Sequence, residues 1–403
     1  MKCFWATRGW TFQESFLSRR RLAFLNDQMY WECNAQHACE AISVTGGDVV
    51  PGYPRMESVN LFGFAAMMRL WELDKEGQRI LDERMAKATE GRPKEFSYGQ
   101  EAPTAPAPLS PEMSAIMDYY STYLACIQQY SERNLTVRAD SINAFIGIID
   151  IFQNHPEYPF HQAWGVPFPV MPQVGPEDRT RFFATALSWS HFSPSDSKQA
   201  RSMEWDDDAN RYVFETLATR RPEFPTWTWG GWAGRVDIQA ATARARFGLL
   251  EHVNCRVQFR DAVDTSRVVG FDDLVEMNVA RGPGADQPRH LVLTAKAIPP
   301  KILLKDGNTE TLRIRLDLDG CHEPKRDIDW WQTRIYKGKD VKCIWLGQFN
   351  NLGVGLVLAR NDKKSKKDGP LWYRLGAFQL AVFWDWTEKM RIDKWDVETF
   401  VIE

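Results

Sequence analysis

The sequence predicts an α+β protein with a helical middle region and a β-rich C-terminal region. Apolar residues recur at helical spacing in much of the chain before residue 245, whereas short strand-like runs separated by turn residues dominate after it. The chain has 403 residues, 44% of them hydrophobic, which is enough apolar material for a sizeable core. We therefore expect three regions: residues 1–50, 51–245 and 246–403.

The opening stretch, residues 8–33, predicts a helix, a strand, a turn and a second strand. Thr11 and Glu14 fit the capping-box pattern, in which two side chains satisfy free backbone donors at the start of a helix. Phe12, Phe16 and Leu17 share one face of the expected helix. The expected strands cover 22–25 and 29–31, and residues 26–28 form the turn between them.

The middle region predicts several helices and one linker. A helical pattern covers 60–89, and the Pro-rich stretch 90–109 reads as a linker. Ser110, followed by Pro and Glu, fits the start of a helix that runs to Tyr130. A further helix is expected over 178–191, and another after Asp140, which we expect to be its N-terminal cap. The apolar stripe of this second helix consists of Ile142, Phe145, Ile146, Ile149 and Phe152.

The last third predicts strands and a hairpin. The strand-like runs cover 291–295, 312–316, 341–349, 354–359 and 372–382. Lys363–Lys367 and the Asp-Gly-Pro that follows form a turn, which we expect to join the last two strands as a hairpin. Upstream, Trp227 and Trp229 alternate in a segment that predicts an extended strand with both indoles on one face.

Composition limits the expected compartment and partners. The net charge of −3 argues against nucleic-acid binding, and the basic runs Arg19–Arg21 and Lys363–Lys367 are interpreted as solvated loops. Seven irregularly spaced cysteines without a signal peptide indicate free thiols in a reducing compartment. No apolar run is long enough to span a membrane. We expect a cytoplasmic protein that binds neither nucleic acid nor a membrane; its oligomeric state is unknown.

The opening stretch carries a motif at fixed spacing. It reads Arg-x-Trp-Thr-x-Gln-Glu, then Leu-Ser-x-Arg, then an apolar strand that ends in Trp-Glu-Cys. This motif resembles the third sequence block of the fungal heterokaryon incompatibility domain. The matching residues are Arg8, Trp10, Thr11, Gln13, Glu14, Leu17, Ser18, Arg20, Trp31, Glu32 and Cys33.

Two later segments extend the resemblance. Residues 130–149 are similar to the helical segment of that family. The stretch 224–232, with Trp227, Trp229 and Trp232, is similar to its Pro-Ser-Trp-Ser-Trp-Ala-x-Trp signature. The resemblance is thin in the C-terminal third.

The resemblance implies a fold and a role. Two earlier blocks of the family are missing, so residues 1–50 would be the C-terminal remnant of an α/β domain that is similar to Toll/interleukin-1 receptor-like folds. The implied role is that of an interaction or signalling module in fungal nonself recognition and programmed cell death. Two alternatives stay open: an enzyme that cleaves NAD or a related nucleotide, and a truncated, inactive paralogue or gene fragment.

Two carboxylates are weak catalytic candidates. A glutamate can serve NAD cleavage in the related receptor-like folds, so the resemblance allows that role for Glu14. Glu14 could equally complete the capping box or pair with Arg8. Glu32 follows a strand, where it could face a cleft or pair with one of the arginines at 19–21.

Other chemical motifs are incomplete. Cys33, His37 and Cys39 lack the second ligand pair of a structural zinc site, and Asp206–Asp208 reads as an acidic turn rather than a cation site. The Gly-x-Gly at 353–355 lacks a third glycine, and no phosphate-binding loop or nucleophile elbow occurs. We expect no cofactor and no metal. The three tryptophans of 227–232 could form an aromatic binding wall or, in our interpretation, pack in the core.

Overall fold

The computed structural model describes only part of the chain. The described residues are 7–24, 29–33, 37–39, 110–191, 203–206, 211–214, 218–238, 249–261, 264–281, 287–299, 312–316, 340–349, 352–361, 370–381 and 392–403. The expected helix over 60–89, the linker 90–109 and the Lys-rich turn 363–367 lie outside them. The chain divides into two compact units, one made of Met1–Thr7 with Thr11–Tyr119 and the other of Arg8–Trp10 with Tyr120–Glu403.

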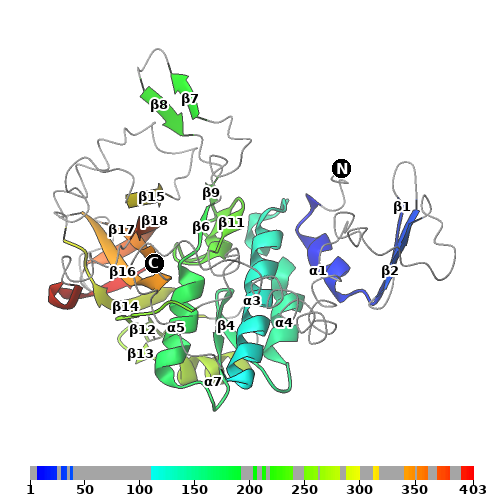
Figure 1. The fold of residues 1–403 in the computed structure, drawn as a ribbon, viewed down its shortest axis with the longest axis horizontal. Helices are drawn as coiled ribbons and strands as arrows, with labels where there is room; N and C mark the ends of the chain where they lie inside the picture. The colour runs from blue at the N-terminus through cyan, green and yellow to red at the C-terminus, as the bar shows by residue number, and fades with distance from the viewer. Residues whose placement is uncertain are drawn as a thin grey trace, which may run out of the picture. The chain divides into compact units, whose positions relative to one another are not determined.

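The described residues have the mixed α+β class that the sequence predicts (Figure 1). The opening stretch is a helix followed by strands, as expected. Its elements are α1 (Trp10–Leu17), β1 (Arg20–Phe24), β2 (Met29–Cys33) and β3 (His37–Cys39), and the three strands pair antiparallel in that order.

The predicted capping box at Thr11 is wrong. The helix α1 begins at Trp10, so Thr11 lies inside its first turn, where its side chain is buried. The backbone N–H of Gly9 donates to the carbonyl oxygen of Asn134 at 2.7 Å, which fixes the residue just before the helix. On the predicted apolar face, Phe12 is buried and its ring lies 6.2 Å from that of Phe16, whereas Leu17 is exposed.

The long middle helix begins as predicted. In α3 (Pro111–Ser131), the Ser110 hydroxyl accepts a hydrogen bond from the backbone N–H of Met113 at 3.1 Å. Two 3-10 turns follow, η3 (Arg138–Asp140) and η4 (Asn143–Phe145), and then α4 (Ile146–Gln153). The predicted cap at Asp140 is therefore wrong, because this residue ends a 3-10 turn and its carboxylate accepts from the Trp10 indole instead.

Short hairpins separate the remaining helices. A two-residue turn, Trp164-Gly165, joins β4 (Phe160–Ala163) to β5 (Val166–Pro169), with φ of 48° and 83°. The helix α5 (Pro176–Leu187) ends earlier than the predicted 191, because Ser190–His191 form β6 and pair with β11 (Val236–Asp237). The other short pairs are β7 (Met203–Asp206) with β8 (Arg211–Phe214) and β9 (Thr219–Arg220) with β10 (Trp232–Ala233).

Eight described strands form one sheet in the last third of the chain. Its order is β13-β12-β14-β19-β18-β17-β16, and β15 also pairs with β18. The elements of this region are β12 (Arg256–Arg260), β13 (Val268–Val269), α7 (Phe271–Arg281), β14 (His290–Lys296), β15 (Leu312–Leu316), β16 (Val341–Phe349), β17 (Leu352–Arg360), β18 (Leu371–Ala381), η8 (Ile392–Lys394) and β19 (Val397–Ile402). The predicted strands and the antiparallel pairing of β17 with β18 are confirmed. Four elements of this region were not predicted: β12, β13, β19 and α7.

The sheet curls so that its far strand reaches back to β14. Ala297, just after β14, forms a bridge with Ile344 of β16, and the backbone N–H of Ile298 donates to the Cys343 carbonyl at 2.9 Å. Across the same junction, Lys342 and Glu398 form an ion pair of 2.7 Å. Strands β14, β19, β18, β17 and β16 therefore close on one another along part of their length.

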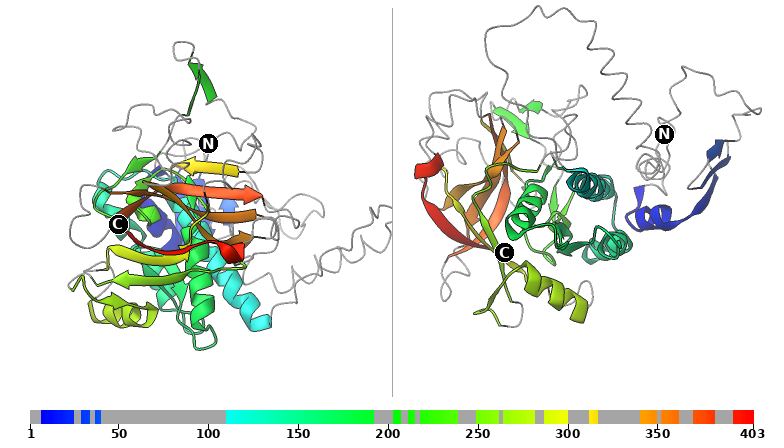
Figure 2. Two further views of the ribbon diagram at one scale, coloured as in Figure 1. Left: turned by 90° about the vertical axis from the view of Figure 1, so that its left-hand side faces the viewer. Right: turned by 60° about the horizontal axis from the view of Figure 1, so that its bottom comes forward.

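The helix α5 lies between this sheet and α3 (Figures 1 and 2). Toward α3, the Tyr120 hydroxyl donates to the Phe182 carbonyl at 2.5 Å. Toward the sheet, the Phe183 ring packs edge-on against Phe259 of β12 at 5.5 Å. The described residues from Tyr120 to Glu403 belong to the same compact unit.

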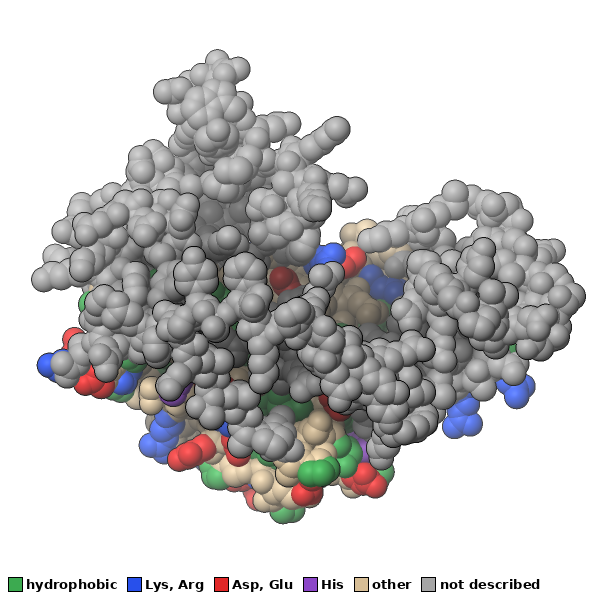
Figure 3. All heavy atoms as spheres, viewed as in Figure 1, with side chains coloured by type: hydrophobic (Ala, Val, Ile, Leu, Met, Phe, Trp, Pro, Cys, Tyr) green, Lys and Arg blue, Asp and Glu red, His purple; other side chains and the backbone are tan. Residues whose placement is uncertain are grey.

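The described surface is mixed in character. Acidic, basic and apolar side chains are interspersed where described residues are visible in the space-filling view (Figure 3). In the part of the chain that the structure describes, no helix is both long and apolar enough to cross a membrane.

The buried cysteines are poor nucleophiles. Cys126, Cys255 and Cys343 are free among the described residues. Burial raises the pKa of the Cys343 thiol to about 12 and also raises that of Cys126. Since the thiolate is the reactive form, both side chains act as small apolar core groups.

Gly355 on β17 provides a test of the packing within the sheet. A Cβ at this position would overlap the Ile344 carbonyl oxygen and the Phe378 ring. We expect Gly355→Ala to lower the free energy of unfolding by about 1–3 kcal/mol in urea titrations, the usual range for overpacking a core. Gly175→Ala is the control, because no atom lies within 4 Å of a Cβ there. Equal effects of the two substitutions would contradict the packing.

His161 on β4 provides a pH test. Burial lowers the pKa of this histidine from its ordinary value of 6.5, and its Nδ1 atom has no hydrogen-bond partner among the described residues. The unfolded chain therefore takes up a proton at a higher pH than the folded chain. The free energy of unfolding should fall as pH drops below 6.5 toward the lowered folded pKa.

The matched variants are His161→Gln and His252→Asn, the second at an exposed histidine. Only the first is expected to flatten the dependence of unfolding free energy on pH between neutrality and mild acid. If the slope is unchanged in His161→Gln, the buried imidazole does not contribute to it.

Candidate functional site

Residues 224–232, here called the tryptophan loop, form a buried hub. The predicted strand over Trp227 and Trp229 is wrong, because Trp229–Gly231 form a 3-10 turn, η6. Each indole N–H donates to a backbone carbonyl: Trp227 to Arg289 at 3.0 Å, Trp229 to Gly165 at 3.0 Å and Trp232 to Thr226 at 2.9 Å. All three side chains are buried. They act as packing and hydrogen-bonding groups of the core, not as an exposed aromatic wall.

The loop joins two aromatic clusters. The Trp227 ring lies 6.2 Å from both Phe183 of α5 and Phe259 of β12. The Trp229 ring lies 5.7 Å from Tyr130 of α3 and 5.3 Å from Phe145. A strand with both indoles on one face could not reach both clusters, which explains why the tight turn replaces it.

Two adjacent arginines hold the carbonyl groups of this loop. The buried Arg221 guanidinium donates to the Trp232 carbonyl and to the Ser141 hydroxyl, each at 2.7 Å. Arg220 donates to the Gly231 carbonyl at 2.7 Å and lies over the Trp232 ring at 5.4 Å. Burial lowers the pKa of Arg221, but an arginine stays charged in proteins. Its planar fork can satisfy several carbonyl oxygens that a turn leaves unpaired.

A third arginine ties the loop to the sheet. Arg374 of β18 is fully buried and donates to the carbonyl groups of Leu187, at 2.9 Å, and of Trp189. Its guanidinium carbon lies 3.4 Å from the centre of the Trp189 ring, a close cation–π contact. Its backbone N–H donates to the Thr226 hydroxyl at 3.0 Å. The only sequence signal for this role was a charged residue within an apolar strand.

The beginning of the motif stretch packs against the segment after α3. The side chain of Arg133 donates to the Arg8 carbonyl at 3.4 Å, and the Trp10 indole donates to the Asp140 carboxylate at 3.3 Å. Gly9 lies against Leu135 so closely that a Cβ would overlap that side chain. Residues Arg8–Trp10 are therefore a structural part of the larger unit.

Ser141 connects this segment to the tryptophan loop. Its carbonyl accepts from the Tyr130 hydroxyl at 2.7 Å, and its hydroxyl accepts from Arg221. Two sets of hydrogen bonds thus meet at neighbouring residues: Trp10 donates to Asp140, and Arg221 donates to Ser141 and to the loop carbonyl of Trp232. The structure brings together three stretches that are far apart in sequence: 8–10, 130–149 and 224–232.

The other motif residues lie along the opening elements. Gln13, Glu14 and Leu17 are on α1, Ser18 follows it, Arg20 begins β1, and Trp31, Glu32 and Cys33 are on β2. Glu14 is exposed, and its carbonyl accepts from the Ser18 hydroxyl at 2.6 Å. The side chains of Glu32, Cys33, His37 and Cys39 lie outside the part that the structure describes. NAD cleavage through Glu14 or Glu32 therefore stays a hypothesis.

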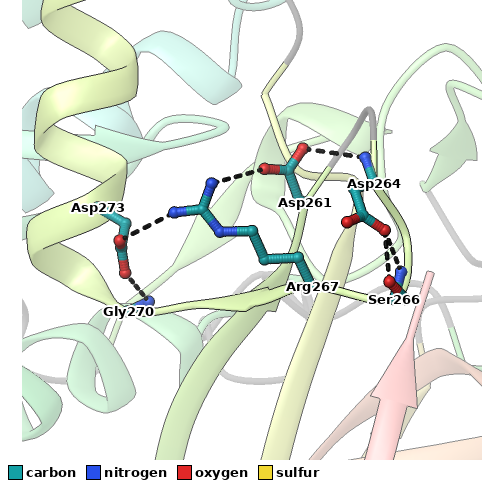
Figure 4. Close-up of polar contacts among 6 residues, drawn as sticks. All are labelled: Asp261, Asp264, Ser266, Arg267, Gly270 and Asp273. Carbon is teal, nitrogen blue, oxygen red and sulfur yellow. Dashed lines mark hydrogen bonds and ion pairs between the residues drawn. The ribbon is translucent and has the colours of Figure 1, made fainter.

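A polar loop before α7 has a structural explanation (Figure 4). Arg267 pairs with Asp273 at 3.3 Å and with Asp261 at 3.9 Å. Asp273 also accepts from the Gly270 N–H at 2.8 Å, as the acidic partner of a capping box does. Hydrogen bonds from Ser266 lower the pKa of Asp264.

Among the described residues, no group of His, Cys, Asp and Glu is arranged to hold a metal ion.

Comparison with known proteins gives no relative. No protein-family model matches the chain, and neither a curated protein nor a solved structure is significantly similar to it.

Arg374 provides the test of this site. Arg374→Met removes two charge-assisted hydrogen bonds to buried carbonyls, each of which typically contributes about 1.5–3 kcal/mol. We expect the free energy of unfolding to fall by roughly 3 kcal/mol or more, measured by urea denaturation. Arg256→Met, at an exposed arginine of β12, should change it by about 0.5 kcal/mol or less. Similar losses in both variants would contradict the anchoring role of Arg374.

Proposed function

We propose that the chain is a heterokaryon incompatibility type of interaction and signalling protein that acts in fungal nonself recognition and programmed cell death. The observation that carries the proposal is the convergence of Arg8–Trp10, Ser141 and the tryptophan loop. These pieces belong to the three stretches that resemble the family. Unrelated matches have no reason to meet at the neighbouring residues Asp140 and Ser141.

The finer fold assignment is part of the same proposal. The helix and hairpin of α1, β1 and β2 are what a remnant of a Toll/interleukin-1 receptor-like domain would retain. Their described pairing is antiparallel, whereas such a domain is built on a parallel sheet.

The geometry favours an interaction role over catalysis. The charged groups at the centre of the site, Arg221 and Arg374, donate to backbone carbonyl groups and an internal hydroxyl. They hold segments in place and do not converge on a space where a substrate atom could react. We therefore expect signals to pass by contact with other proteins.

Inducible expression in a filamentous fungus tests the proposal. The product of the verified full-length transcript is expected to arrest growth and to admit a death-specific dye. Gly9→Val should abolish this effect at equal protein abundance, because the side chain would separate Arg8–Trp10 from Leu135. Arg256→Ala lies outside the converging segments, so it should arrest growth and admit the dye as the wild-type protein does. Continued normal growth with the wild-type protein would count against the proposal.

A further inference from the structure

Two histidines lie at the ends of the segment that leads into the β4–β5 hairpin. His155 is in the turn that follows α4, and His161 is the second residue of β4. We call residues 155–161 the histidine segment. The contacts of both rings suit the neutral imidazole and not the charged imidazolium.

His155 closes its turn as a hydrogen-bond acceptor. Its Nδ1 atom accepts from the backbone N–H of Tyr158 at 2.9 Å and from that of Glu157 at 3.3 Å, and its ring stacks on the Tyr158 ring at 5.4 Å. An imidazolium carries a hydrogen on both ring nitrogens, so it cannot accept these bonds. Partial burial lowers the pKa of His155, and the Glu157 carboxylate opposes this effect only in part. The turn is therefore stable only while the ring is neutral.

His161 is buried within the hairpin. Its ring lies 6.4 Å from the Phe168 ring on the paired strand, and its Nδ1 atom has no hydrogen-bond partner among the described residues. A charged ring in this position would face an aromatic side chain and would lack an acceptor for the hydrogen on Nδ1. Such a buried and unsatisfied charge is unfavourable.

The neighbouring carboxylates do not compensate for a charge on His161. Burial is the cause of its lowered pKa, with no contribution from a charged group in the described part of the chain. The helices α3, α4, α5 and α7 pack against the hairpin, and their carboxylates are exposed or paired with arginines. The exposed ones are Glu112, Asp118, Asp150, Glu177 and Glu276, and the paired ones are Asp178, Asp272 and Asp273.

We propose that the histidine segment is an acid-sensitive switch, which opens when His155 and His161 take up protons and closes when they lose them. In the open form both rings are in water and bind protons at a higher pH than in the closed form, so acid shifts the population toward opening. At pH 5.5, each histidine can favour opening by up to about tenfold. This inference goes beyond the proposed function and does not depend on it.

Opening is expected to be local. The far end of the hairpin is held by the tryptophan loop, because Thr228 and Trp229 donate to the carbonyl groups of its turn. The near end includes Phe160, whose ring is buried against Tyr120 and Phe182. Acidification would therefore uncover the Phe160 ring while the tryptophan loop stays in place.

Hydrogen exchange of the full-length chain, followed by mass spectrometry, tests the switch. Amide protection is compared at pH 7.5 and pH 5.5, after correction for the intrinsic effect of pH on exchange. We expect the peptide covering 155–161 to lose about tenfold or more in protection at pH 5.5. At that pH it should also be less protected than the peptide covering β16, because a local opening needs less free energy than complete unfolding.

The decisive variant is His155→Asn combined with His161→Gln, since neither amide titrates and Asn keeps an acceptor oxygen for the turn. Its protection over 155–161 should change little between the two pH values, and His155→Asn alone should lose part of the dependence. His252→Asn, at an exposed histidine, is the control and should behave like the wild type. Equal protection of 155–161 and β16 in the wild type at pH 5.5 would overturn the proposal. So would a pH dependence that persisted unchanged in the His155→Asn variants.

Discussion

The described fold depends on guanidinium groups that satisfy buried carbonyl oxygens. A turn within a core exposes carbonyls to an apolar surrounding, where each unpaired group costs about 1–3 kcal/mol. Arg221 and Arg374 supply donors from two directions, and the cation–π contact with Trp189 compensates in part for removing the Arg374 charge from water. Without these donors the loop could not stay buried between helices and sheet.

Local sequence patterns predicted the elements that nearby residues stabilise. They failed where residues far apart in the sequence determine the backbone conformation. Short apolar runs between turn residues were enough to place β16, β17 and β18, and Ser110 was enough to place the start of α3. The tryptophan loop was misjudged because its indoles are directed by carbonyl groups at Gly165 and Arg289, which no nearby sequence feature indicates. The alternation of β-branched residues in β19 is a strand signal that could have predicted this element.

The candidate site shows the same division. The motif spacing identified Trp10 and the three tryptophans of the loop, but not Asp140 as the indole acceptor or Ser141 as the link to Arg221. Arg374 was not identified because a single arginine in a strand is usually exposed and only the packed structure shows otherwise. Residue types thus indicated where the site is, and tertiary contacts showed what its charges do.

The position of β19 has a consequence for how the protein is made. This strand follows both of its neighbours in the sequence, yet it lies between β14 and β18 and runs parallel to β18. During synthesis, its two neighbours emerge from the ribosome first and must wait with unpaired edges until it arrives. Such edges invite association with other chains. Chaperones that shield nascent strands should therefore matter more for this protein than for one whose sheet grows outward in order of translation.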